Sequence, residues 1–222
     1  MNNALAGILL YALLHGAVWA DSPVQEVESY SLGAAETYPA GANAMLTHQF
    51  SPALVFFTAT GWRKESIFNA VKTAAGILGQ CGIEIQNAEL HLLAVPEKFK
   101  YYYVPVSREL ARIAPFPKPT VYFVKDTLQA ERFDSEAIGK SNSRTRPELR
   151  DTVWIAYGAK DLGVSLAHEL AHLLMDSGEH VSDPENLMQE ESSPRSTKLN
   201  SAQCERMRDA GSENGLLKPV AR

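Results

Sequence analysis

The clearest pattern of apolar and polar positions covers residues 164–175. Projected on a helix, His168 and His172 lie in one polar sector. Apolar residues fill the other sides, with Leu166, Ala167, Leu170, Leu173 and Leu174 opposite and Val164, Ala171 and Met175 on one flank. The pattern predicts a buried helix with one polar, solvent-facing stripe. We expect it to end near residues 176–178, because Gly178 can adopt the left-handed conformation that stops a helix.

Shorter patterns around this helix predict an α+β fold. Apolar runs bounded by turn residues predict strands over residues 52–60, 83–95, 120–124 and 152–157, of which the second is one strand or a bent pair. Residues 101–106 are aromatic and strand-like. Helices are predicted over residues 65–80, 108–113 and 199–207, with Ser107 as the cap of the second and Asn200 or Ser201 as the cap of the third.

Three of the six histidines, His168, His172 and His180, fall in and just after the striped helix. His168 and His172 are four residues apart and can share one ion, and with Glu169 they form the pattern HExxH. In that pattern the two imidazoles bind zinc and the glutamate reaches a water on the ion. A catalytic zinc ion usually takes three protein ligands, and we expect His180 to be the third.

Other donors remain open for the third position. Asp176 lies one turn beyond His172 on the same face, and Glu190 or Glu191 could come from a following segment. A glutamate on a second helix is disfavoured, because Ser-Ser-Pro follows directly and proline interrupts helices. A site with only two protein ligands is the remaining alternative.

The stretch after the third histidine, His180–Met188 (HVSDPENLM), resembles the segment that leads to the Met-turn in the metzincin clan of zinc metallopeptidases, in particular its matrixin-like members. The resemblance implies that Met188 forms an apolar floor beneath the metal. It also implies a twisted mixed sheet with an active-site helix, a Met-turn and a C-terminal helix. In this family an edge strand accepts an extended substrate, which we expect within residues 137–144 unless they form a solvated loop. Residues 189–198 would then wall the substrate pocket.

The spacing departs from the family pattern HExxHxxGxxH. Met175 and Gly178 occupy the positions of its glycine and third histidine, which indicates a helix longer by part of a turn. Glu190 stands where some metzincins carry a tyrosine after the Met-turn, so no tyrosine switch is expected.

The predicted chemistry follows from the three neutral imidazoles. Because neutral ligands do not reduce the +2 charge of the zinc ion, they favour a pKa of about 7 for the water bound to it. Glu169 is predicted to take the proton of that water and pass one to the leaving amine. The sequence thus predicts a zinc metalloendopeptidase that acts on protein or peptide substrates. A non-catalytic exported zinc-binding domain and a metal-free protein with a coincidental HExxH remain as alternatives.

The N-terminal residues indicate export. Residues 1–20 carry no charged side chain, contain the apolar run 4–14 and end with small residues suited to cleavage after Ala20. We therefore expect a signal peptide at 1–20 and a secreted or periplasmic protein, with an uncleaved membrane anchor as the alternative. Residues 21–50 are predicted to form an irregular arm or a short pro-segment, and residues 51–215 the zinc metallopeptidase domain.

Composition narrows the possible partners. The chain has 21 Lys and Arg against 26 Asp and Glu, a net charge of -5, which gives no basic footprint for nucleic acid. The only cysteines, Cys81 and Cys204, predict a disulfide in an exported chain, although two buried thiols are possible. His91 lies in an apolar run and is expected to be a strand residue. We expect a monomer with no stable membrane association after signal cleavage.

Overall fold

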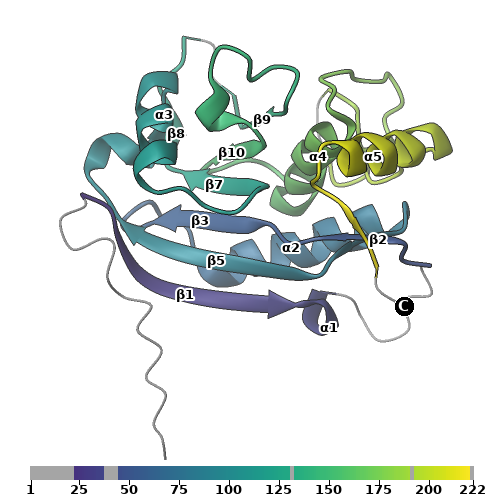
Figure 1. Ribbon diagram of the computed structural model, residues 1–222, viewed down its shortest axis with the longest axis horizontal. Coiled ribbons are helices and arrows are strands. Elements are labelled where there is room, and N and C mark those ends of the chain that lie inside the picture. Colours follow the sequence, from purple (N-terminus) through teal and green to yellow (C-terminus); the bar gives the residue numbers. More distant parts are fainter. Residues whose placement is uncertain (1–22, 38–44, 131–132, 191–192, 221–222) are drawn as a thin grey trace, which may run out of the picture.

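A six-stranded mixed sheet forms the centre of the protein, with the order β1-β5-β3-β7-β10-β9 (Figure 1). The structure is a computed structural model that describes residues 23–37, 45–130, 133–190 and 193–220. The strands are β1 (Gln25–Gly33), β3 (Ala53–Phe57), β5 (Asn87–Ala94), β7 (Thr120–Val124), β9 (Ser135–Ile138) and β10 (Thr152–Ala156). The four inner strands are parallel, and each edge strand is antiparallel to its neighbour. The predicted signal segment lies outside the described residues.

Helices pack against both faces of this sheet. One core contains residues of α2 (Lys64–Gly79), α4 (Leu162–Met175) and α5 (Ser201–Glu213), and the other contains residues of α3 (Val104–Ile113). The smaller elements are α1 (Ala34–Thr37), η1 (Glu97–Lys100), η2 (Pro147–Leu149), a sheet of β2 (His48–Phe50), β4 (Ile83–Ile85) and β11 (Lys218–Pro219), and the pair β6 (Tyr101–Tyr102) and β8 (Asp126–Thr127). No helix in the described part of the chain is both long and apolar enough to cross a membrane.

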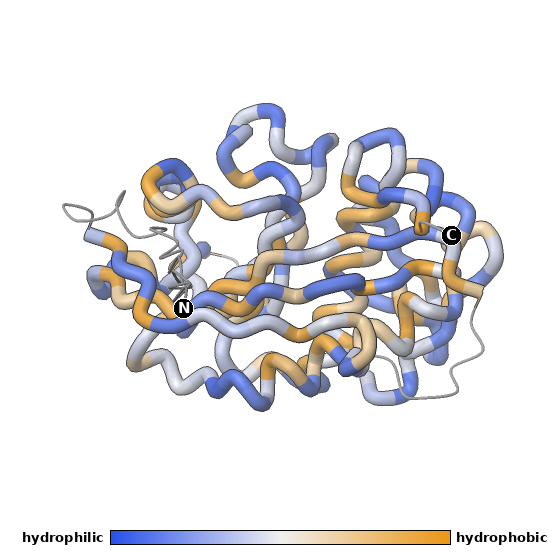
Figure 2. Tube along the Cα trace, turned by 60° about the horizontal axis from the view of Figure 1, so that its bottom comes forward, coloured by the Kyte–Doolittle hydropathy of each residue, from blue (hydrophilic) through white to orange (hydrophobic). Residues whose placement is uncertain are grey.

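The inner strands supply both cores, because successive side chains point to opposite faces of a sheet. In β7, Val121 and Phe123 join the core of α2 and α4, whereas Tyr122 and Val124 join the core of α3. Strands β3, β7 and β10 are accordingly buried and mostly apolar along their whole length, whereas β5 also carries polar residues. Figure 2 shows apolar and polar segments interspersed along the strands and helices, with polar segments in the loops at the top of the view.

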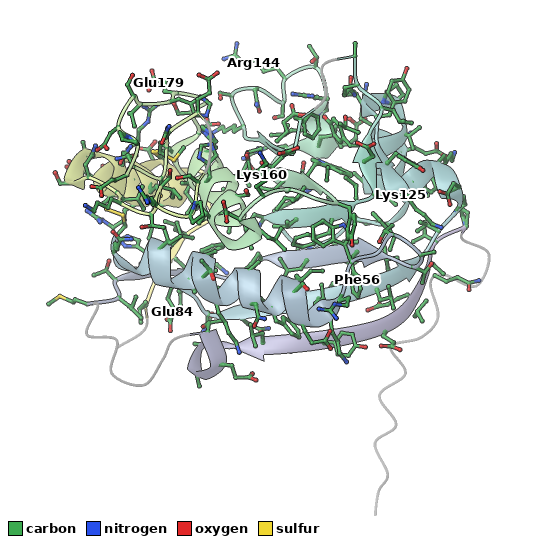
Figure 3. All side chains as sticks on the ribbon, turned by 180° about the vertical axis from the view of Figure 1, so that it is seen from behind. Phe56, Glu84, Lys125, Arg144, Lys160 and Glu179 are labelled. Atoms are coloured by element: carbon green, nitrogen blue, oxygen red, sulfur yellow. A yellow bond between two sulfur atoms is a disulfide. The ribbon has the colours of Figure 1, made fainter. Side chains whose placement is uncertain are left out.

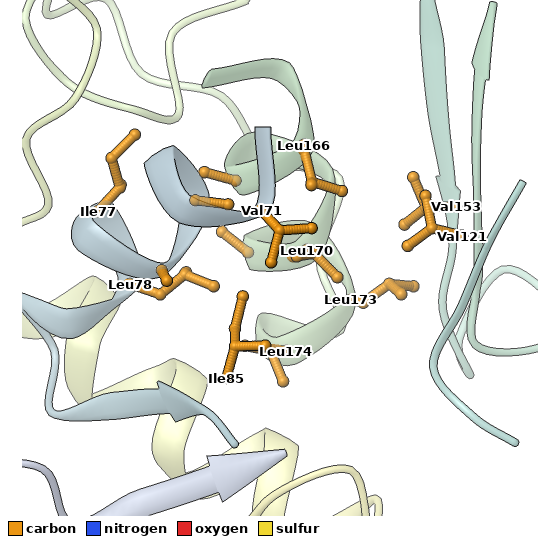
Figure 4. Packing of buried hydrophobic residues seen from close by; sticks show 14 of the residues in the cluster. Val71, Ile77, Leu78, Ile85, Val121, Val153, Leu166, Leu170, Leu173 and Leu174 are labelled. Atoms are coloured by element: carbon orange, nitrogen blue, oxygen red, sulfur yellow. The ribbon is translucent and has the colours of Figure 1, made fainter. Parts of the chain in front are cut away.

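The helix with the polar stripe, α4, is buried along most of its length. Every residue from Val164 to Met175 is buried, and Figure 4 shows Leu170 facing Val71 of α2. Gly163 allows this close approach, because a Cβ atom added there would lie 2.5 Å from Cβ of Thr73. The side chains on α4 are thus held by packing on several sides.

A disulfide fixes α5 to the rest of the fold. Cys81, just after α2, is bonded to Cys204 in α5 across a sequence separation of 123 residues, as the sequence predicted. Asn200 caps α5: its side chain accepts from the N–H of Gln203, whose side chain accepts from the N–H of Asn200. The predicted cap is confirmed, and the helix extends further than predicted, to Glu213.

The predicted irregular arm over 21–50 is wrong for Gln25–Gly33, which forms the nine-residue edge strand β1. Most of its side chains are exposed, so it lacks an apolar pattern, and backbone pairing with β5 stabilises it instead. His91 of β5 lies on this ladder, with Nδ1 2.8 Å from Oε1 of Glu26. It is a strand residue, as expected. Whether 21–50 is a removable pro-segment stays a prediction.

The prediction around Ser107 is also wrong. Helix α3 begins at Val104 with Tyr103 as its N-cap, so Ser107 lies inside the helix and only residues 101–102 of the aromatic run form a strand. A proline in the first turn, Pro105, is compatible with this start. For residues 83–95, predicted as one strand or a bent pair, the bent pair is confirmed, and its halves β4 and β5 belong to different sheets.

Candidate metal centre

The structure brings the three predicted histidines together. Helix α4 carries His168 and His172 on adjacent turns, and the chain beyond its end returns so that His180 faces them. The Nε2 atoms lie 2.9 Å apart for His168 and His172, 3.1 Å for His172 and His180, and 3.3 Å for His168 and His180. Among the described residues they form the one group of three histidine, cysteine or acidic side chains close enough to share a metal ion.

The hydrogen bonds of the other ring nitrogens show which nitrogens are free. Nδ1 of His168 lies 2.7 Å from the carbonyl oxygen of Leu187, and Nδ1 of His172 lies 2.6 Å from that of Ser177. A carbonyl oxygen only accepts, so both Nδ1 atoms donate. In a neutral imidazole the Nε2 atom then carries a lone pair. These Nε2 atoms face each other without a proton between them, an arrangement that a shared cation stabilises.

The donor set fits a zinc ion. Burial lowers the pKa of His168 and lowers that of His172 to about 4, which keeps both imidazoles neutral. Zinc binds neutral imidazole nitrogen at about 2.0–2.1 Å, and tetrahedral geometry at that distance separates the nitrogens by roughly 3.3 Å. The observed separations of 2.9 to 3.3 Å are close to this value. His180 is exposed, so the site is open to solvent.

The turn that returns His180 is made by Asp176 and not, as predicted, by Gly178. Asp176 has φ 47° and ψ 47°, and its N–H donates to the carbonyl oxygens of His172 and Leu173. Gly178 is not among the described residues with positive φ. Oδ1 of Asp176 accepts from the N–H of Ser141 at 2.9 Å, so this carboxylate holds the loop after β9.

The alternative third donors do not join the histidine group. Asp176 is engaged with the loop after β9, and Glu190 lines the nearby cleft without belonging to the group. Glu191 lies outside the described residues. Of the described donors weighed from the sequence, the structure places only His180 with His168 and His172.

Glu169 lies next to this group and is buried, with 5% of its surface exposed. Its Oε1 accepts a hydrogen bond from Ser135 Oγ at 2.8 Å. Burial raises the pKa of Glu169 to about 7, although the Ser135 hydrogen bond acts in the opposite direction. A carboxyl group in this environment can take and release a proton near neutral pH. Ser135 was not predicted from the sequence, because no motif links residues 34 positions apart.

A cleft of about 960 Å³ opens beside the histidines and Glu169. Its walls come from β9, the loop after β9 and the loop after α4, which project from the same side of the molecule (Figure 3, with Arg144 and Glu179 labelled on these loops). In the main sheet, β9 pairs with β10 alone, and Ser135 and Ala137 of β9 line the cleft. The predicted edge at 137–144 is therefore a strand only to Ile138, and its remainder is mainly turn.

The turn at Asn186–Met188 contacts the segments of two histidines. The carbonyl oxygen of Leu187 accepts from His168 Nδ1, and that of Met188 accepts from the N–H of Val181, directly after His180. The Met188 side chain is buried, with 1% of its surface exposed. Its predicted role as the floor of a metal site stays a prediction.

Comparison with known proteins shows a likeness in fold. No protein-family model and no curated protein matches the sequence. Among solved structures, the chain is similar to metalloproteinase-II from Bacteroides fragilis, with a TM-score of 0.51 and 19% identity, over 78% of this chain and 55% of that one. The chain spans about half the length of that protein. At this identity the likeness shows a shared mixed α+β fold.

Proposed function

We propose that the protein is a zinc metalloendopeptidase in which His168, His172 and His180 hold one zinc ion. The observation that carries this proposal is the set of three facing Nε2 atoms, two of them fixed as lone-pair donors by carbonyl partners. The likeness in fold to a metalloproteinase supports it. Bound zinc would lower the pKa of a water molecule and polarise the substrate carbonyl.

Glu169 is proposed as the general base and acid. Its carboxylate follows His168 directly in the sequence, lines the cleft and is oriented by Ser135 Oγ. From this position Glu169 can take a proton from the attacking water and pass it to the leaving amine. Ser135 acts on Glu169 alone in this scheme, by holding one carboxylate oxygen.

The substrate is proposed to be an extended stretch of a protein or peptide. Among the described residues no other strand pairs with the outer edge of β9, which lines the cleft, so a peptide can add to it as a further strand. Residues 189–198 would wall the pocket for its side chain, and Met188 would lie beneath the metal, as in metzincins. A secreted or periplasmic location is supported by the disulfide, which persists in oxidising compartments.

The test compares wild type with Glu169→Gln on a random peptide library, with zinc content measured on the same samples. We expect chelator-sensitive cleavage by wild type. The variant should hold as much zinc but cleave at least about 100-fold more slowly, because it cannot take the proton. Zinc-loaded wild type that cleaves nothing would instead indicate a non-catalytic zinc-binding domain. Equal cleavage by the variant would remove Glu169 from the mechanism.

A further inference from the structure

Two side-chain amides join the start of α5 to the Asn186–Met188 turn. Asn186 Nδ2 donates to Gln203 Oε1 at 3.0 Å, and Gln203 Nε2 donates to Asn186 Oδ1 at 2.9 Å. Asn186 is buried, with 5% of its surface exposed. A closed pair of this kind holds both side chains in one orientation, because each amide supplies one donor and one acceptor.

Backbone donors fix the orientation of both amides. Oδ1 of Asn186 also accepts from the N–H of Met188 at 2.9 Å, and Oε1 of Gln203 also accepts from the N–H of Asn200 at 2.9 Å. Rotating either amide by half a turn would place an NH2 group against an N–H donor. The pairing is therefore set by the main chain on both sides.

The turn held by this pair is the same turn that contacts the histidines. Two residues of the turn do so: Leu187 accepts from Nδ1 of His168, and Met188 accepts from the N–H that follows His180. A shift of the turn would therefore move the acceptor that orients one imidazole and the backbone next to another. Partners of this kind orient metal-binding histidines and keep the required nitrogen free.

The other end of the connection, α5, is a firm support. Cys204, next to Gln203, is bonded to Cys81 after α2, and Met207 one turn later is fully buried. The capping box formed by Asn200 and Gln203 completes the first turn. The position of Gln203 is thus determined by covalent and packing constraints that do not involve the histidines.

We propose that Gln203 is a positioning residue for the zinc site: through Asn186 it fixes the turn that orients His168 and places the segment of His180. This inference rests on the proposed function, because it assumes that the histidines hold zinc. The ion pair between Arg206 and Glu179 also reaches this region from α5. Its side chains are 49% and 79% exposed, so solvent weakens it and it contributes little to the positioning.

The decisive variant is Gln203→Glu. A glutamate keeps the acceptor for Asn200 and so keeps the capping box. It loses the donor to Asn186 Oδ1 and places a second acceptor oxygen there. Its negative charge would by itself strengthen the binding of a cation, so weaker binding cannot come from the charge. Gln203→Met, neutral and of similar length, removes the contact to Asn186 without adding charge, and it also removes the acceptor for the Asn200 N–H.

Arg208→Ala is the matched control on the same helix. Arg208 donates to the carbonyl oxygen of Cys81 at 2.9 Å. Its loss therefore also removes a hydrogen bond that holds α5, but at Cys81 and not at the Asn186–Met188 turn. Zinc dissociation constants are measured by competition with a chelator, and the visible spectrum of the cobalt-substituted protein reports the ligand geometry. We expect zinc binding about tenfold weaker and a changed cobalt spectrum in both Gln203 variants, and neither change in Arg208→Ala.

The outcomes separate this inference from the proposed function. If wild type retains no zinc after dialysis, the proposed function fails and the positioning role fails with it. If wild type binds zinc and both Gln203 variants bind it as tightly, with the same cobalt spectrum, only the positioning role is overturned. A loss of affinity in Arg208→Ala equal to that in the Gln203 variants would also overturn it, because any loosening of α5 would then be sufficient.

Discussion

Two helical glycines should respond in opposite directions to the same substitution by alanine. Gly76 in α2 has open space around its Cβ position, with nothing within 4 Å. Gly163 in α4 faces α2, where an added Cβ would lie 2.5 Å from Cβ and 2.7 Å from Cγ2 of Thr73. The Cβ atom of Thr73 is attached directly to the backbone of α2, so the two helices would have to separate.

The expected magnitudes follow from these contacts. Alanine is favoured over glycine in a helix interior by about 1 kcal/mol, so Gly76→Ala should stabilise the protein by up to that amount. Carbon atoms pack at about 3.5–4.0 Å, so Gly163→Ala needs roughly 1 Å of helix displacement. Overpacking of this kind costs about 1–3 kcal/mol, which outweighs the gain in helix propensity.

The assay is thermal unfolding of both variants and wild type at the same zinc concentration. For a chain of this size about 1 kcal/mol corresponds to a change in Tm of roughly 2–4 °C. We expect Gly76→Ala to raise Tm by a few degrees and Gly163→Ala to lower it by up to about 8 °C. Gly163→Ala should also weaken zinc binding, because α4 carries His168 and His172. A Gly163→Ala protein as stable as Gly76→Ala would refute the packing of α4 on α2.

Three further predictions concern charge, the disulfide and the metal. Burial raises the pKa of Asp151, so the folded state holds its proton more tightly than the unfolded state, and this carboxyl destabilises the fold increasingly as pH rises above about 4. Asparagine tolerates the φ of 57° found at position 151. Asp151→Asn should therefore raise Tm at pH 7 and change it little at pH 3. An equal change of Tm at both pH values would contradict this prediction. Replacing Cys81 and Cys204 by serine should lower the free energy of unfolding in denaturant by about 4–5 kcal/mol, because it removes a constraint across 123 residues, and a loss below about 1 kcal/mol would argue against it. Adding a chelator should lower Tm by roughly 5–10 °C when free zinc had been about 100-fold above its dissociation constant, and an unchanged Tm would indicate that the folded protein holds no zinc.

Much of the fold was predictable from the sequence, because the inner strands of the sheet are buried on both faces. Strands β3, β7 and β10 are continuous apolar runs, and α4 has a regular apolar pattern with one polar stripe, so each was visible locally. Strand β1 was missed because most of its side chains are exposed and its stability comes from pairing with β5. A strand that is stabilised by backbone pairing with its neighbour shows no apolar pattern from which it could be predicted.

The candidate site was predictable where chemistry and helical spacing coincide. His168, Glu169 and His172 lie within five consecutive residues, so their proximity needs only a helix. The end of that helix near 176–178 was predicted correctly, but Asp176 and not Gly178 takes the left-handed conformation. Oδ1 of Asp176 accepts from the N–H of Ser141, a contact that only the folded chain makes. The contacts of Ser135 and Gln203 were missed for the same reason, since they join residues that only the folded chain brings together.

The most direct test of the account is the zinc content and zinc affinity of wild type beside His180→Ala. We expect one zinc ion per wild-type chain after dialysis, and markedly weaker binding in the variant, because two imidazoles on α4 do not complete the site. Equal zinc affinity in the two proteins would show that His180 is not a ligand and would contradict the three-histidine site on which the proposed function depends.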